Sequence, residues 1–576
     1  MTRVSGWRWV WGLLVGCGVI AISSSAQVTI TTLVNFNGTN GNGPDAALTQ
    51  GADGNFYGTT GAGGASADCA SGCGTIFKVI AGGVTTLYSF CAEPGCADGS
   101  DPMGPLVQAA NGDFYGTTSA RGAYGGGTVF KITLTGILTT LYSFCALANC
   151  ADGYRPNGGL VQGRNGNFYG TTIDGGVRSC FDFNVGCGTV FEITPAGTLT
   201  TIYSFCASNA DCPDGEFPSS GLLQASNGQF YGETAAGGAT PYGTVFEITP
   251  NGKLTTLSSF DGSNGAGPSG GLIQAANGNF YGIAGDGGTG TACSGSYGCG
   301  TVFVVTTAGK LTTLYNFCSL PGCTDGSFPY GPLVQGTDGN LYGTTLTGGV
   351  FNSRQGTLFE IARDGALTTL YSFCLVFNCP DGGAPDGLMQ NTNGMFYGTT
   401  AGGGTGNDGT VFSLNRGLGA FVKTQPGFAN EGMKIGIFGQ GFTSSSIVQF
   451  GGVQATNVKV SGSTFLFATV PAGALTGSVT VTTGATTLTS NQPFRVTPQV
   501  VSFDPPSGSV GTQVTITGTG FTQTNGVGFG DNVPAEFTVN SDTQVTATVP
   551  AGAKTGPVGV ATKGGTAVST ATFTVN

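Results

Sequence analysis

One segment type is displaced along this chain, and the displacement limits what the chain can fold into. Residues 31–36 read TTLVNF, with close copies at 85–90 and 139–144. Most copies follow a GT(V/I/L)F segment, but the first copy has none before it, and the last GTVF, 409–412, has no TTLxxF after it. Each segment type occurs seven times. The displacement predicts a ring, because the first segment can supply the strand missing beside the last GTVF.

One full copy, residues 104–144, predicts four short antiparallel strands. PLVQAA is followed by an Asn-Gly turn and DFYGTT, and GTVFKIT is followed by a turn around Gly136 and LTTLYSF. Two-residue turns of this kind require positive φ at both central positions, which makes them strong hairpin signals. The turn recurs in every copy, at Asp53-Gly54, Asn111-Gly112, Asn165-Gly166, Asn227-Gly228, Asn277-Gly278, Asp338-Gly339 and Asn393-Gly394.

These copies predict an all-β fold in which residues 27–420 form a seven-bladed β-propeller closed by the N-terminal strand. An open array, or a ring of six or eight blades, is the alternative. Neighbouring Phe and Tyr in FYG would point to opposite faces of a sheet, so both faces need covering, as in stacked blades. The FYG tyrosines are therefore expected to pack between blades rather than to contact ligand.

The N-terminus and the charge balance predict an exported acidic protein. Residues 1–26 have the basic start, apolar run and small-residue end of a signal peptide. Lipidation at Cys17, within Leu-Val-Gly-Cys, is the minority alternative. Removing residues 1–26 takes away two arginines and changes the net charge from −11 to −13. That charge disfavours nucleic-acid binding, and no transmembrane segment is expected in the mature chain.

Sixteen cysteines remain after residue 26, and they fall into close neighbours. An even number in an exported chain predicts disulfides, whereas the variable spacing and the absence of histidine make zinc binding the weaker interpretation. No metal site is therefore expected. The expected pairs are Cys69-Cys73, Cys91-Cys96, Cys145-Cys150, Cys180-Cys187, Cys206-Cys212, Cys293-Cys299, Cys318-Cys323 and Cys374-Cys379.

The cysteines also distinguish the two faces of the predicted ring. They all lie in the second-to-third and blade-to-blade loops, which vary in length, whereas the other connections are tight turns. We call the cysteine-bearing side the loop face and expect any ligand there.

Each blade-to-blade loop has an Asp or Asn that could form a ring near the channel, as a cation site or polar ligand collar: Asn40, Asp98, Asp152, Asp214, Asn264, Asp325 and Asp381. The favoured alternative is an Asx-turn, in which the side chain binds its own loop.

The sequence gives catalysis little support. Without histidine no Ser-His-Asp or Cys-His arrangement is possible, and no cofactor motif is present. A carboxylate pair for sugar cleavage remains possible. All three tryptophans precede residue 26, so loop tyrosines such as Tyr124, Tyr154, Tyr242, Tyr297 and Tyr330 are the candidates for sugar stacking.

Two copies of another pattern follow the repeats. GQGF at 439–442 matches GTGF at 518–521, and VPAGA recurs at 470–474 and 549–553. Alternating β-branched stretches predict small sandwiches over 421–497 and 498–576. The phrase SGSVGTQVTITGTGF, followed by TVPAGAKTGPVGV, resembles the IPT/TIG family of immunoglobulin-like domains. The resemblance implies spacers or binding modules in surface proteins.

The phrases GxFYGTT, GT(V/I)F(K/E)I and LTTLYSF, over residues 30–415, resemble the GloVer (Gloeo_Verruco) repeat of exported bacterial choice-of-anchor proteins. That resemblance implies export but no activity. We therefore expect a secreted or cell-surface binding or adhesion module, with the loop face for ligand and the Ig-like domains as spacer. Its partners would be an extracellular glycan, cell-wall material or a surface protein. The alternative is a glycan-degrading enzyme, a glycosidase or lyase, using carboxylates near the channel.

Overall fold

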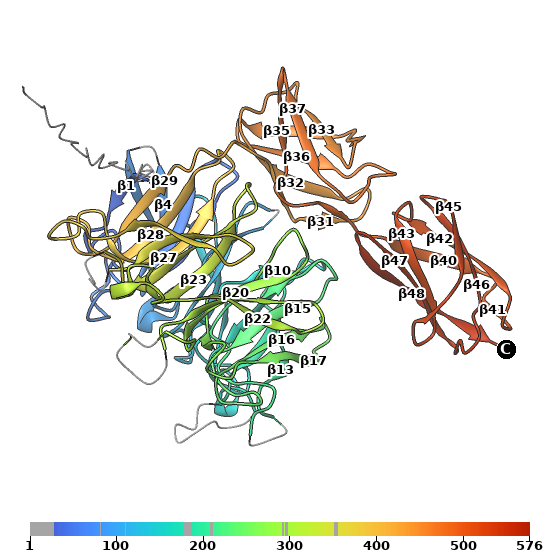
Figure 1. Cartoon of the computed structure of the whole chain (residues 1–576), viewed down its shortest axis with the longest axis horizontal. Helices are drawn as coiled ribbons and strands as arrows, with labels where there is room; N and C mark the ends of the chain where they lie inside the picture. Colours follow the sequence, from blue (N-terminus) through green and yellow to red (C-terminus); the bar gives the residue numbers. More distant parts are fainter. Residues whose placement is uncertain are drawn as a thin grey trace, which may run out of the picture.

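The protein is all-β, with short 3-10 turns in its loops (Figure 1). The computed structural model describes residues 28–576 apart from residues 81, 110, 178–185, 208–210, 291–292, 294–297 and 351–354. The expected leader and Cys17 lie outside this range. The 3-10 turns are η1 (Pro94–Cys96), η2 (Ala148–Cys150) and η4 (Pro321–Cys323).

Seven antiparallel sheets follow one another through the repeats; the first six are each built from consecutive strands, and the seventh also includes the N-terminal strand. The first sheet has β2 (Thr49–Gln50), β3 (Phe56–Thr60), β4 (Thr75–Ile80) and β5 (Gly83–Ser89). The second has β6 (Val107–Gln108), β7 (Phe114–Thr118), β8 (Thr128–Ile132) and β9 (Leu138–Ser143). The third has β10 (Val161–Gln162), β11 (Phe168–Thr172), β12 (Thr189–Ile193) and β13 (Leu199–Ser204). The fourth has β14 (Leu223–Gln224), β15 (Phe230–Thr234), β16 (Thr244–Ile248) and β17 (Leu254–Ser259).

The last three sheets vary this plan. In the fifth, two short strands pair with the same neighbour, so the sheet has β18 (Ala266–Pro268), β19 (Ile273–Gln274), β20 (Phe280–Asp286), β21 (Thr301–Val305) and β22 (Leu311–Asn316). The sixth has β23 (Ser327–Gln335), β24 (Leu341–Thr347), β25 (Thr357–Ile361) and β26 (Leu367–Ser372). The seventh has β27 (Gly383–Gln390), β28 (Phe396–Gly402), β29 (Thr410–Leu414) and β1 (Ile30–Asn35).

The displaced N-terminal segment completes the seventh sheet. Strand β1 runs antiparallel to β29, with Thr32 opposite Phe412, and the backbone N–H of Phe36 donates to the carbonyl of Gly409 at 3.0 Å. The seventh sheet also meets the first directly. A Cβ on Gly387 would lie 2.4 Å from the backbone nitrogen of Ala47, so only glycine permits this approach.

Aromatic side chains pack each sheet against the next. The FYG tyrosine of one sheet lies on the Phe of the next, with ring centroids 4.0–4.3 Å apart for Tyr57–Phe114, Tyr115–Phe168, Tyr169–Phe230, Tyr231–Phe280, Tyr342–Phe396 and Tyr397–Phe56. Tyr281 shares a core cluster with Leu341 of the sixth sheet. The last of the stacked pairs joins the seventh sheet to the first. The tyrosines are buried in packing, as expected from the sequence.

We call the first strand of each sheet in chain order the innermost strand (β19 in the fifth sheet and β27 in the seventh). Each innermost strand has a glutamine near its end, and this side chain reinforces the contacts between sheets. Its amide nitrogen donates to the following turn, as Gln335 Nε2 does to the carbonyl of Gly339 at 3.1 Å. Its oxygen accepts from the preceding sheet, as Gln335 Oε1 does from the backbone N–H of Ala276 at 3.1 Å. Gln108, Gln224, Gln274 and Gln390 repeat both bonds.

Two Ig-like sandwiches follow (Figure 1). The first contains β30 (Lys423–Gln425), β31 (Phe428–Ala429), β32 (Lys434–Phe438), β33 (Ile447–Phe450), β34 (Val453–Gln454), β35 (Val458–Gly462), β36 (Phe465–Thr469), β37 (Val479–Thr483), β38 (Thr486–Thr489) and β39 (Arg495–Val496). The second contains β40 (Gln499–Asp504), β41 (Ser507–Gly508), β42 (Gln513–Thr519), β43 (Thr524–Phe529), β44 (Val533–Pro534), β45 (Phe537–Ser541), β46 (Gln544–Thr548), β47 (Gly556–Thr562) and β48 (Gly565–Val575). In the described part of the chain, no helix has the length and apolar character needed to cross a membrane.

The first Ig-like domain packs against the repeat sheets. Gln440 Nε2 donates to Thr392 Oγ1 of the seventh sheet at 3.0 Å, and Gln492 Nε2 donates to Gln335 Oε1 of the sixth at 2.8 Å. On the opposite side, Gln425 donates to the carbonyl of Gln108 in the second sheet. The domain thus spans several sheets at the glutamine ends of their innermost strands.

Candidate functional site

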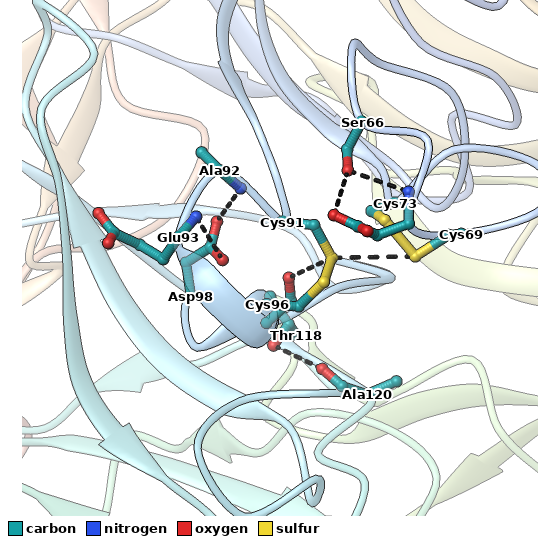
Figure 2. The surroundings of a disulfide bond; sticks show 12 residues. Ser66, Cys69, Cys73, Cys91, Ala92, Glu93, Cys96, Asp98, Thr118 and Ala120 are labelled. Atoms are coloured by element: carbon teal, nitrogen blue, oxygen red, sulfur yellow. Dashed lines mark hydrogen bonds between the residues drawn. A yellow bond between two sulfur atoms is a disulfide. The ribbon is translucent and has the colours of Figure 1, made fainter.

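The Asx positions hold their own loops together. Asp98 Oδ2 accepts from the backbone N–H of Ala92 at 3.0 Å and Oδ1 accepts from the backbone N–H of Glu93 at 3.3 Å (Figure 2). Asp98 Oδ2 also accepts from Tyr88 Oη at 2.9 Å. Equivalent bonds occur at Asp152, Asp214, Asp325 and Asp381.

The tyrosine partner of each such aspartate lies on the fourth strand of its sheet. Asn40 and Asn264 lack this tyrosine, and their oxygens accept from the N–H of Asn37 and Asp261. These bonds are those of the Asx-turn alternative, with the side chains turned into their loops. A ligand role for the seven positions stays a prediction.

Disulfides close the five loops that contain the aspartates, and further disulfides close loops between the second and third strands of a sheet. The structure contains Cys69–Cys73, Cys91–Cys96, Cys145–Cys150, Cys206–Cys212, Cys293–Cys299, Cys318–Cys323 and Cys374–Cys379. The expected Cys180–Cys187 pair includes Cys180, outside the described residues. Two disulfides come close together, with Cys293 Sγ 3.5 Å from Cys318 Sγ. Those four sulfur atoms lie within 4.8 Å of one another, a cluster that could hold a metal ion if reduced, but here they are bonded in pairs.

A pocket of about 220 Å³ lies where all seven sheets meet, at the start of their innermost strands. Each sheet contributes the residue that follows the repeated proline, and we call these seven residues the collar: Asp45, Met103, Asn157, Ser219, Ser269, Tyr330 and Asp386. The residue before each proline has positive φ, between 51° and 63°, at Gly43, Asp101, Arg155, Phe217, Gly267, Phe328 and Ala384. This left-handed residue and the fixed φ of proline turn the chain from the cystine loop into the innermost strand.

Neighbouring sheets hold the collar backbone in place. The residue after Asp45 is Ala46, whose carbonyl accepts from Thr399 Oγ1 of the preceding sheet at 3.2 Å. Thr59 and Thr117 donate in the same way to the carbonyls of Gly104 and Gly158. The collar side chains therefore project from backbone that is fixed on both sides.

The acidic side chains of the collar come from the first and seventh sheets, which are adjacent. Asp386 is 3% exposed, and its Oδ2 has no hydrogen-bond partner among the described residues. Burial, reinforced by the negative charge of Asp45, raises the pKa of Asp386 well above its ordinary value. Burial also raises the pKa of Asp45 to about 6. Tyr330, in the sixth sheet, has its pKa raised to about 12 by burial and by these two carboxyl groups.

Another buried carboxyl group, that of Glu233, lies next to residues that line this pocket. Glu233 stands where most copies have the first threonine of FYGTT, and it is 1% exposed. Its Oε2 accepts from the Gly271 N–H at 2.9 Å and from Ser220 Oγ at 3.4 Å, while Oε1 has no partner among the described residues. Burial raises the pKa of Glu233 to about 8.

This arrangement can accept hydrogen bonds and can donate a proton. Two adjacent carboxyl groups with separated proton affinities can bind hydroxyl or cationic groups, and such pairs also supply acid and base in sugar hydrolysis. The Tyr330 ring adds a flat surface for a sugar.

Sequence reasoning singled out Tyr330 but missed Asp45, Asp386 and Glu233. A signal was available in the repeats themselves. Between a constant proline and a nearby leucine, the collar position changes from copy to copy, and position 233 breaks the FYGTT phrase with a glutamate. Variation within a constant frame marks side chains that the fold itself does not require.

The fold and the collar define a multi-sheet β-repeat protein with appended Ig-like domains, and family comparison agrees. The model described as Gloeobacter/Verrucomicrobia repeat matches residues 11–184, 148–292 and 183–412, and the IPT/TIG domain model matches 422–496 and 498–575. The chain belongs to the Gloeobacter/Verrucomicrobia repeat family and carries two IPT/TIG domains. No curated protein matches the chain significantly.

Solved structures share only a distant β-rich likeness. A fungal alcohol oxidase of the AA5 family with copper is 12% identical, with 95% of this chain and 99% of that chain covered and a TM-score of 0.41. The extracellular domain described as that of a hybrid two-component system from B. thetaiotaomicron is 10% identical, with coverages of 94% and 58% and a TM-score of 0.46. A surface glycan-binding protein from Prevotella bryantii is 20% identical, with coverages of 25% and 37% and a TM-score of 0.21. Scores this low transfer no activity to this chain.

Proposed function

We propose that the repeat region is a closed seven-bladed β-propeller and that the protein is an extracellular binding module. The ring is supported by the pairing of β1 with β29 and by the stacking of Tyr397 on Phe56 between the seventh and first sheets. Residues 1–26 as a leader, and disulfides throughout the loops, support export. The two Ig-like domains would act as spacers between this region and a surface.

The observation that carries the binding role is the pocket lined by one variable residue from every sheet. Its acidic half leaves Asp386 Oδ2 without a partner, which a ligand hydroxyl or amine would satisfy. A volume of about 220 Å³ suits one sugar unit or one side chain of a larger partner, rather than a whole oligosaccharide. Extracellular glycan or cell-wall material is therefore the proposed ligand class, bound by a terminal or protruding unit.

A binding screen with matched variants tests this proposal. The mature full-length chain would be assayed for retention on glycan and cell-wall panels. Asp386→Asn combined with Tyr330→Ala should weaken retention at least tenfold, because it removes the carboxyl group that would bind the ligand and the aromatic ring. Asp364→Asn, on an exposed tight turn away from the collar, should have no effect. Equal retention of the collar variant and the wild type would refute the proposed site.

The collar carboxyl groups also favour a second function, a glycan-degrading enzyme. Asp386, which holds its proton more tightly, would act as the general acid, and Asp45 would act as base or nucleophile. Release of reducing ends from a retained glycan, abolished by Asp386→Asn with retention preserved, would establish this activity. Retention without any release would leave the binding module.

A further inference from the structure

A second cavity, of about 520 Å³, lies between the repeat sheets and the first Ig-like domain, and we call it the junction cavity. Its repeat side consists of the ends of the innermost strands in the fourth to seventh sheets, including Gln224, Gln274 and Gln390. Its Ig-like side includes Phe421, Lys423, Phe428 and Arg495. These strands begin at the collar pocket, so the two sites lie at opposite ends of the same innermost strands.

The charge of the junction cavity is opposite to that of the collar. Lys423 and Arg495 line it, and no aspartate or glutamate is among its described lining residues. Neither cation takes part in an ion pair within the described part of the chain. The whole chain has only 19 basic residues and a net charge of −11. Two unpaired cations at one cavity are therefore unusual for its composition.

A third cation, Arg164, lies beside the junction cavity and adds to its positive charge. The guanidinium of Arg164 lies over the Phe428 ring, 4.6 Å from its centroid, and Nη2 donates to the Ser226 carbonyl at 2.9 Å. Its Nε is buried without a hydrogen-bond partner among the described residues. Burial, together with the neighbouring positive charge of Arg495, lowers the pKa of Arg164 to about 10.

The other two cations are also desolvated. Burial lowers the pKa of both Lys423 and Arg495. Lys423 nevertheless keeps accessible surface. Both observations follow from its position, because the side chain faces an open cavity while protein surrounds that cavity. The side chain of Lys423 is exposed, so its ammonium group is free to meet a ligand.

The uncharged residues that line the junction cavity indicate what the ligand contains besides an anionic group. Gln335 is held by Gly339, Ala276 and Gln492, so this amide is already engaged and rigid. Phe421 and Phe428 supply flat apolar surface. A cavity of this volume accommodates one or two sugar units. Charge-assisted hydrogen bonds from lysine and arginine are the strongest available to a carboxylate.

We propose that the junction cavity binds a carboxylate-bearing sugar of the uronic acid class, with Lys423 and Arg495 as the anion-binding residues. Arg164 acts as a positioning residue that holds Phe428 and adds positive potential. The site needs both the repeat sheets and the first Ig-like domain, so it exists only in the full chain. It is independent of the loop-face ligand proposed above.

Calorimetric titration of the full-length chain with glucuronate, glucose and sodium sulfate tests the site. Glucuronate should bind saturably and glucose should not. Lys423→Gln and Arg495→Gln should each weaken glucuronate binding at least tenfold, because each removes a charged donor. Lys310→Gln, in an exposed turn, is the matched control and should bind like wild type. Asp386→Asn should also bind glucuronate normally, which separates this test from that of the collar.

Every other outcome overturns the proposal. Equal binding of glucose would define a neutral-sugar site, and binding of sulfate without glucuronate would define a site for inorganic oxyanions. No saturable glucuronate binding at millimolar concentration would eliminate the site. Because a variant might fail to fold, each would be checked by thermal unfolding. Lys423→Gln should match the wild-type melting temperature, since Lys423 is exposed and makes no ion pair with any described residue.

Discussion

At the scale of single residues, the unusual feature is carboxyl groups kept in the interior without a cation beside them. Glu233 and Asp386 are 1% and 3% exposed, and each has an oxygen with no partner among the described residues. Burying an ionised carboxyl group costs several kcal/mol, so such groups hold their protons instead. The fold would be more stable with neutral side chains at both positions. Their presence supports a role in binding or proton transfer rather than in folding.

The pKa of Glu233 predicts how stability depends on pH. Because the folded state raises this pKa from 4.5 to about 8, the folded protein binds the proton more tightly than the unfolded chain. The stabilisation is complete below pH 4.5 and is lost as the pH rises through about 8. Glu233→Gln should remove this component and gain on the order of 5 kcal/mol over wild type at pH 9. Urea denaturation at pH 5, 7 and 9 measures it, and parallel pH profiles would contradict it.

At the scale of strands and loops, the fold depends on an edge strand that is remote in sequence. Strand β1 buries Val34, 5% exposed, and Phe36, fully buried, the latter 5.0 Å from the Phe77 ring of the first sheet. The segment therefore contacts two sheets that are adjacent only if the repeats close on themselves. Burying each of these side chains contributes about 2 kcal/mol.

Removal of β1 tests the closure. Deleting residues 27–36 from the mature chain should lower the free energy of unfolding by about 4 kcal/mol or more, because two buried side chains and a strand ladder are lost. A synthetic peptide of residues 27–36, added in trans, should restore part of the melting temperature. A peptide with Val34→Asp and Phe36→Asp should not. An unchanged melting temperature after deletion would show that the strand does not fasten the ring.

The disulfides stiffen loops rather than join sheets, since each described pair spans only four to six residues. A loop of this length contributes about 2 kcal/mol by the chain-entropy model. Reduction with dithiothreitol should therefore lower the melting temperature while leaving the far-ultraviolet β spectrum unchanged. Protection of the loops from protease should fall at the same time. Loss of the β spectrum on reduction at 25 °C would mean that the bonds hold the sheets together.

Short sequence patterns are enough to predict most of these elements. The Asn-Gly turns, the displaced TTLVNF and the cysteine spacing each act over a few residues, so the sequence alone predicts the hairpins, the partner of β1 and the described disulfides. The collar escaped prediction because Asp45 and Asp386 are separated by most of the repeat region, and only the arrangement of the sheets brings them together. The seven Asx positions were singled out because an Asp or Asn recurs at the same place in every repeat. Their hydrogen bonds show that this residue stabilises its own loop.

At the scale of the whole molecule, the first Ig-like domain is packed against the repeat region and forms part of its architecture. It spans the glutamine ends of the innermost strands and encloses the junction cavity there. No periodicity could predict this contact, because it joins two different repeat types through single polar side chains. Its consequence is that the two ends of the innermost strands differ, with an acidic pocket at the loop face and a basic cavity at the domain junction.

One threonine connects three parts of this assembly. Thr392 Oγ1 accepts from Gln440 Nε2 of the Ig-like domain at 3.0 Å and from Gln50 Nε2 of the first sheet at 3.2 Å. Its hydroxyl group also lies 3.2 Å from the Gly439 carbonyl. Thr392→Val keeps the shape of the side chain but leaves these polar groups unsatisfied. We expect a loss of about 2 kcal/mol in the free energy of unfolding and a looser domain junction.

The rate of trypsin cleavage measures how loose the domain junction is. Arg416 lies in the segment between the repeat region and the first Ig-like domain, and Glu360 Oε2 holds it at 2.6 Å. Cleavage after Arg416 should become several-fold faster in Thr392→Val than in wild type. Thr135→Val, at an exposed turn, is the control and should be cleaved at the wild-type rate. If the junction also forms the proposed anion site, glucuronate should slow cleavage of the wild type by favouring the closed arrangement. Wild-type cleavage rates in Thr392→Val would mean that other contacts, such as Arg164 on Phe428, suffice to hold the domain.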